Sequence, residues 1–155
     1  MWRTAAMNGG AKRLVFPALA GFYAGFEPIA YTILRVAIGA ILFVHGWGKF
    51  ISGHAGVTGM FGRIGLPEPG PLAYAAMFLE TIGALCVLVG LFTRFFAAAL
   101  AIEMLVAMLA VHLAKGFGVG GGGYEYVLLL GIVMFAIAIR GGGPYSADAK
   151  IGREL

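Results

Sequence analysis

Three ionisable side chains, Arg35, His45 and Lys49, stand inside residues 31–50, an apolar run long enough to cross a lipid bilayer. Charged groups inside such a run are costly, so they need partners in neighbouring helices or access to water. At about 100° per residue, Lys49 lies roughly 40° from Arg35 around a helix, and His45 lies roughly 80° from it. The three therefore share one side, which we expect to face other helices rather than lipid.

Two carboxylic acids, Glu80 and Glu103, stand in other apolar runs. Intramembrane carboxylates are the usual groups of proton or substrate relays, and the planar fork of an arginine can hold them. Arg35 and Glu103 are expected about 9 and 12 Å from the cytoplasmic end, with Glu80 about 12 Å from the outer end. These depths predict a charge network in which Arg35 pairs with Glu103, or reaches inward to Glu80. A buried ion pair that only fixes helix order is the alternative.

A second polar group is expected at the outer mouth of the helices, where it would form a ligand site. Its members are His45, Trp47, Lys49, His112, Tyr124 and Glu125. Histidine titrates near neutral pH and suits proton exchange, so this group could bind the head of a quinone. The alternative is that these residues only anchor the helices, as interfacial aromatic rings and lysines do. No residue is assigned a catalytic role.

The elements that must position these groups follow from composition. The 155 residues are 61% hydrophobic and 12% charged, whereas soluble domains are about a quarter charged. We therefore predict an all-α, single-domain membrane protein over residues 1–155. Its expected architecture is a transmembrane four-helix bundle, with spans at about 29–51, 72–92, 95–114 and 124–140. Residues 14–26 are expected to form an N-terminal interfacial helix, and residues 52–71 a loop with a short helix near 57–64.

Four glycines are expected to let these helices approach closely: Gly39, Gly46, Gly83 and Gly90. Gly39 and Gly46 share the side of Arg35, so the polar side of the first span is also its close-contact side.

Basic residues near the span ends predict orientation, because lysine and arginine favour the cytoplasmic side. Seven fall on one side: Arg3, Lys12, Arg13, Arg94, Arg140, Lys150 and Arg153. Three fall on the other: Lys49, Arg63 and Lys115. This predicts a multi-pass protein of the cytoplasmic (inner) membrane with both termini cytoplasmic. The lipid bilayer is its expected partner, and no nucleic-acid binding is expected.

The single cysteine, Cys86, excludes a mechanism that uses two cysteines within the chain. No grouping of cysteine and histidine has the spacing of a zinc or iron–sulfur site. We therefore expect no metal and no intrinsic cofactor.

Several motifs together resemble the DoxX family of small four-span membrane proteins. They are LRVAIGAILFVHGWGKF (34–50), GLPEP (65–69), FLETIGALCVLVGLFTR (78–94), AIEMLVA (101–107), VH (111–112), YEY (124–126) and GGGPYSADA (141–149). The family motif positions that match include Ser146 and Asp148 in the tail. The resemblance implies a four-helix bundle in the cytoplasmic membrane.

The resemblance leaves three functions open. Some members resemble subunits of quinone-linked systems, such as quinol oxidase or thiosulfate:quinone oxidoreductase, which favours a redox-associated subunit that uses quinone as an external cofactor. Such a subunit would contact a membrane redox complex or form a homo-oligomer. The second function is a non-enzymatic assembly, stress-response or binding component. The third is a small proton-coupled transporter that uses Glu80 and Glu103.

Overall fold

The computed structural model describes residues 14–154, and these form helices joined by short turns, with no strand among them. The α-helices are α1 (Ala20–Arg63), α2 (Pro69–Phe78), α3 (Ala84–Val89), α4 (Thr93–Ala107), α5 (Glu125–Arg140) and α6 (Ala147–Ile151). Two π-helical turns, η2 (Leu79–Gly83) and η3 (Met108–His112), and three short 3₁₀ turns, η1 (Pro17–Leu19), η4 (Leu113–Lys115) and η5 (Val119–Gly121), complete the chain. The all-α prediction is confirmed.

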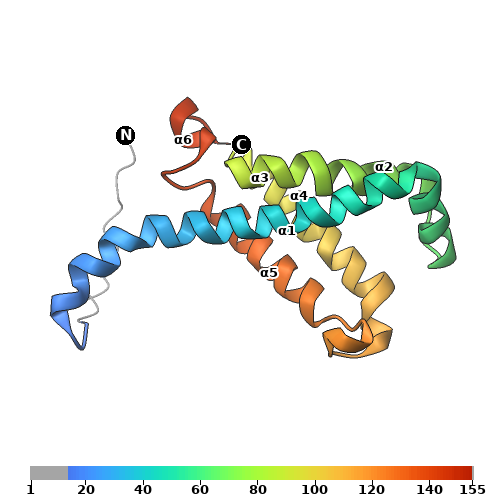
Figure 1. The fold of residues 1–155 in the computed structure, drawn as a ribbon, viewed down its shortest axis with the longest axis horizontal. Coiled ribbons are helices and arrows are strands. Elements are labelled where there is room, and N and C mark those ends of the chain that lie inside the picture. The colour runs from blue at the N-terminus through green and yellow to red at the C-terminus, as the bar shows by residue number, and fades with distance from the viewer. Residues whose placement is uncertain (1–13, 155) are drawn as a thin grey trace.

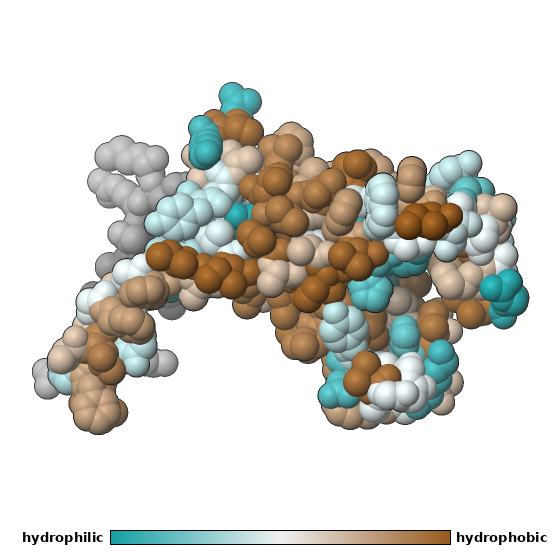
Figure 2. Space-filling model, viewed as in Figure 1, coloured by the Kyte–Doolittle hydropathy of each residue, from teal (hydrophilic) through white to brown (hydrophobic). Residues whose placement is uncertain are grey.

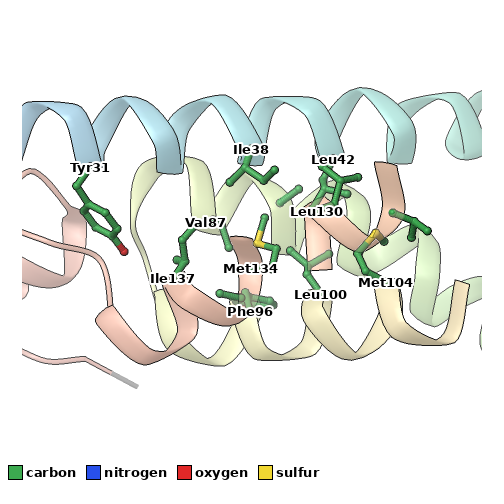
Figure 3. Close-up of a cluster of buried hydrophobic side chains, with 13 residues drawn as sticks. Tyr31, Ile38, Leu42, Val87, Phe96, Leu100, Met104, Leu130, Met134 and Ile137 are labelled. Carbon is green, nitrogen blue, oxygen red and sulfur yellow. The ribbon is translucent and has the colours of Figure 1, made fainter. Parts of the chain in front are cut away.

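Figure 1 shows α1 running along the length of the molecule, with α2 and α3 returning beside it. In this view α4 starts near α3, crosses behind α1, and packs extensively against α5. The core lies where these helices meet, and its buried side chains include Ile38, Leu42, Val87, Leu100, Met134 and Ile137 (Figure 3). The side chains at the centre of this core are therefore apolar, and the core supports the polar groups described below.

Three helical segments are long and apolar enough to cross a membrane: Pro17–Arg63, Pro69–Val89 and Thr93–Lys115. The fourth long helix, α5, has 16 residues. Large apolar side chains such as Ile33 and Val44 lie exposed on the outer faces. Figure 2 shows hydrophobic side chains over the middle of the molecule, with hydrophilic ones gathered toward its ends. This distribution is typical of a membrane protein.

The N-terminal segment is continuous with the first span. Residues 17–26 form η1 and the first turns of α1, and α1 continues through Pro28 to the span itself. The separate interfacial helix expected at 14–26 is not confirmed. The basic residues Arg3, Lys12 and Arg13, which entered the topology prediction, lie outside the described residues.

The segment after the first span is mostly helical rather than a loop, which corrects the prediction for residues 52–71. Gly53 interrupts α1 with φ 71° and ψ 159°, and the helix then resumes as far as Arg63. Only glycine adopts this backbone conformation readily, so it marks the bend. We call residues 54–64 the arm. Figure 1 shows this part of the chain turning away from the axis of α1 at the end opposite α6.

Candidate functional site

Lys49 and Glu80 form an ion pair between α1 and η2, in which the Lys49 ammonium donates to Glu80 Oε2. The Glu80 side chain is 5% exposed and that of Lys49 is 23% exposed. Gly46 brings the helices together, because a Cβ at this position would overlap the Glu80 carbonyl group. Glu80 also lies in a π-helical turn, a feature that is frequent at functional sites.

Glu103 on α4 completes a cluster with this ion pair. Its carboxyl group interacts with that of Glu80 and lies within range of the Lys49 charge. Its Oε2 atom is buried and has no hydrogen-bond partner. A buried acceptor without a partner costs stability, so it is a candidate ligand contact. We call Lys49, Glu80 and Glu103 the carboxyl cluster.

The carboxyl cluster lines a cavity of about 440 Å³ that is otherwise almost wholly apolar. Its polar residues are Lys49, Glu80, Glu103 and His112. Its apolar walls come from α2, η2, α4, η3 and the arm, and include Leu72, Ala76, Leu79, Ile102, Ala107 and Val111. This volume is in the range of small-molecule sites. A site with one polar group of residues and apolar walls suits a ligand with a polar head and an apolar body.

The arm supplies one wall of the cavity through Met60, Phe61 and Ile64. His54, directly after the Gly53 bend, holds the arm against α2. Its Nε2 atom lies 3.0 Å from the Gly70 carbonyl oxygen, and its ring stacks on Tyr74 at 3.7 Å between centroids. His54 was not among the predicted site residues, although a histidine directly after a glycine near the end of the first span is a visible signal.

His112 reaches the cavity from η3. Its Nδ1 atom lies 2.7 Å from the carbonyl oxygen of Gly122, in the glycine-rich segment of residues 116–123. A carbonyl oxygen can only accept, so Nδ1 carries the proton and donates. In the neutral ring, Nε2 is then an acceptor.

The other residues of the expected outer-mouth site do not line this cavity. The ring of His45 lies 6.2 Å from that of Tyr126, and Trp47 stacks between Phe43 and Phe50 on the outer face of α1. Tyr124 packs edge-to-face against Phe117, while Glu125 Oε2 accepts a hydrogen bond from the Val119 amide at 3.1 Å. Of the six mouth residues, Lys49 and His112 are the two that meet Glu80 and Glu103 at the cavity.

Arg35 does not join the carboxyl cluster, which corrects the predicted pairing with Glu103 or Glu80. Its guanidinium donates to the carbonyl oxygens of Val87 and Leu88 at 2.7 and 2.6 Å, and to that of Tyr145 at 2.8 Å. Val87 and Leu88 lie at the end of α3, where carbonyl groups lack partners within the helix. Main-chain carbonyl groups at the end of α3 and in the tail, rather than a carboxylate, therefore explain why an arginine is buried here.

The C-terminal tail completes this end of the molecule through Asp148. Its carboxylate accepts from the amides of Phe92 and Thr93 at 2.8 and 2.9 Å and from the Thr93 hydroxyl at 2.7 Å. These donors lie at the start of α4, where helix amides lack partners and negative charge is favoured. Ser146 caps α6 by accepting from Ala149. We call Arg35, Thr93, Tyr145, Ser146 and Asp148 the tail cluster.

The expected glycine contacts are found at both clusters. A Cβ at Gly39 would lie 2.9 Å from the Leu88 amide nitrogen, and one at Gly90 would overlap Ser146 and the Arg35 guanidinium. A Cβ at Gly83 would lie 3.0 Å from Phe96 Cδ1. Among residues 14–154, no group of three histidine, cysteine or acidic side chains is arranged to hold a metal ion.

Comparison with known proteins identifies a family and two similar proteins. The family model described as DoxX matches residues 30–113. A Bacillus subtilis protein named "Putative oxidoreductase CatD" is 38% identical over 109 residues, which cover 70% of this chain and 78% of the relative. A Haemophilus influenzae protein named only "Uncharacterized protein" is 30% identical over 133 residues, covering 83% and 96%. No solved structure matches the chain. The matched family region contains Arg35 and the whole carboxyl cluster.

Proposed function

The chain belongs to the DoxX family, and from the geometry of its cavity we propose that it binds the head group of a quinone and exchanges protons with it. The observation that carries this proposal is the carboxyl cluster at the wall of an apolar cavity inside helices able to cross a membrane. A quinone has the matching form, a polar ring on an apolar tail. The B. subtilis relative's name, which includes "oxidoreductase", supports a redox association.

The charges of the cluster suit proton exchange. With both carboxyl groups ionised, Lys49, Glu80 and Glu103 together carry one net negative charge, and one added proton makes the group neutral. Two carboxyl groups in contact away from water favour sharing a proton, because like charges at short range repel strongly there. Reduction of a quinone takes up two electrons and two protons. The cluster and His112 relay the protons, and a partner redox protein supplies the electrons.

The membrane arrangement follows from the same helices. The three long segments and α5 are four spans of a bundle in the cytoplasmic membrane, with the tail cluster at the cytoplasmic end and the arm outside. Single cysteines in a Cys86→Ala background test this arrangement. A cysteine at Ile151 is expected to react only from the cytoplasmic side, and one at Gly56 only from the outer side. Labelling of both from one side would contradict the four-span arrangement.

Quinone binding is tested by filling the cavity. A short-chain benzoquinone is expected to raise the melting temperature of the purified protein in detergent. Ala107→Phe places a ring in the cavity and should abolish the rise. Ala98→Phe is the matched control, because Ala98 lies on the same helix but is exposed on another face. It should keep the rise.

The apo melting temperatures show whether each variant folds, and Ala110→Phe offers a second, more exposed position in the cavity wall. If the quinone raises the melting temperature of Ala107→Phe and Ala110→Phe as much as that of the wild type, then the quinone binds outside this cavity. No rise in the wild type over a saturating range, together with no quinone in its lipid extract, would leave the carboxyl cluster as a structural group only.

A further inference from the structure

The Glu103 carboxyl group presents an acceptor that the described residues leave unused. Its Oε2 atom is buried and without a hydrogen-bond partner, on a residue that lines the cavity. Buried polar atoms almost always have a partner in a native protein, and the exceptions call for a ligand, a water molecule or a function. When Glu103 Oε1 carries the proton shared with Glu80, Oε2 can only accept. In that arrangement its missing partner is a donor.

We propose that the cavity prefers the reduced, hydroxyl-bearing form of its ligand, the quinol, and that Glu103 Oε2 accepts a hydrogen bond from one quinol hydroxyl. This inference rests on the proposed function and adds selectivity for one redox state. A quinone carbonyl oxygen has no hydrogen to give and would leave Oε2 unpaired. Because the bound quinone would exclude water from the cavity, leaving this acceptor unpaired would cost binding free energy.

The other polar residues of the cavity fit a hydroxyl as well as or better than a carbonyl. Lys49 donates to Glu80 and has further hydrogens, which either a carbonyl or a hydroxyl oxygen can accept. His112 donates through Nδ1 to Gly122, so in the neutral ring its Nε2 atom accepts. A hydroxyl group both donates and accepts, and can satisfy Lys49 and Glu103 together.

A direct comparison of ligands tests the inference in the wild-type protein. Binding of a short-chain benzoquinone, its hydroquinone and the dimethyl ether of that hydroquinone is measured anaerobically in nanodiscs. We expect the hydroquinone to bind about tenfold tighter than the other two, the ratio that one good hydrogen bond provides. Equal affinity for the hydroquinone and its dimethyl ether, or tighter binding of the quinone, would overturn the inference.

Two variants assign the preference to Glu103. Glu103→Leu removes the acceptor and should reduce the ratio of hydroquinone affinity to quinone affinity to about one. Glu103→Gln keeps a carbonyl acceptor, and its amide can donate to Glu80 in place of the shared proton. It should therefore keep most of the preference. An undiminished preference in Glu103→Leu would exclude Glu103 as the acceptor.

The two proposals fail in different ways. If none of the three ligands binds to the wild type, the proposed function is wrong. If the benzoquinone and the hydroquinone bind equally and compete for one site that Ala107→Phe blocks, the proposed function stands and the redox preference is wrong.

Discussion

The tail cluster and the carboxyl cluster both hold ionisable groups inside an apolar protein, yet they use them differently. At the tail cluster, Asp148 has three donors and Arg35 has three main-chain acceptors, although Arg35 Nε is buried without a hydrogen-bond partner, and Arg35 does not line the cavity at the carboxyl cluster. At the carboxyl cluster, Glu80 has one cation, Glu103 keeps an unpaired oxygen, and both face a cavity.

Under the proposed function, this difference separates a structural polar cluster from a ligand-binding one. The contacts of the tail cluster join segments distant in sequence, namely α1, the end of α3, the start of α4 and the tail, so its polar groups hold the fold. The carboxyl cluster retains an unused polar atom beside a cavity, which is an arrangement that lowers stability unless a ligand uses it. We therefore expect changes at the tail cluster to alter stability most, and changes at the carboxyl cluster to alter ligand response most.

The largest expected effect is that of Asp148→Ala. It leaves the Phe92 and Thr93 amides and the Thr93 hydroxyl without their acceptor, and hydrogen bonds to a charged group are worth about 1.5–3 kcal/mol each. We expect the free energy of unfolding, measured by denaturing-detergent titration in mixed micelles, to fall by about 3 kcal/mol or more. Asp148→Asn keeps an acceptor oxygen and should lose less. A loss below that of a typical surface change would contradict the structural role of the tail cluster.

Gly46→Ala is expected to come next, at the carboxyl cluster. A Cβ there overlaps the Glu80 main chain, which cannot move without shifting η2. Overpacking of this kind costs about 1–3 kcal/mol. Gly48→Ala is the matched control, because nothing lies within 4 Å of its Cβ position. Similar unfolding free energies for the two variants would show that α1 and η2 do not depend on this contact.

The sequence was sufficient for the helical fold and for the polar residues, but not for their pairing. The apolar runs predicted the helices because burial and lipid contact both require them. Lys49 was predicted at an outer mouth because it stands near the end of the first span, whereas α1 runs on past it to Gly53 and the long lysine side chain reaches Glu80. Arg35 was predicted to pair with carboxylates because opposite charges attract each other. Residue spacing does not reveal that Arg35 reaches the carbonyl groups at the end of α3. Nor does it reveal that the C-terminal tail returns to the same place.

Gly53→Ala should have a smaller effect on stability and a larger one on the ligand. Its φ of 71° and ψ of 159° strain any residue with a Cβ, but nothing lies within 4 Å of that position, so the arm can shift to relieve the strain. We expect a cost of about 1–2 kcal/mol. The quinone-induced rise in melting temperature should fall, because the arm forms a wall of the cavity. Gly56→Ala, at a helical position in the arm, should change neither.

The smallest expected change in stability is that of Glu103→Leu, and its direction separates the two clusters. Leucine removes the unpaired buried oxygen and the second carboxyl group beside Glu80, and leaves the Lys49–Glu80 ion pair intact. Replacing an unsatisfied polar group by an apolar one of similar shape is nearly neutral or stabilising. We expect the unfolding free energy without ligand to rise by up to about 1 kcal/mol.

In the same variant, the hydroquinone-induced rise in melting temperature should fall to the level seen with the quinone. The mirror experiment at the tail cluster is Asp148→Asn, which should lower the unfolding free energy and leave the hydroquinone response as in the wild type. A large loss of stability in Glu103→Leu would mean that Glu103 holds the helices together as Asp148 does. The contrast between a structural and a functional cluster would then be wrong.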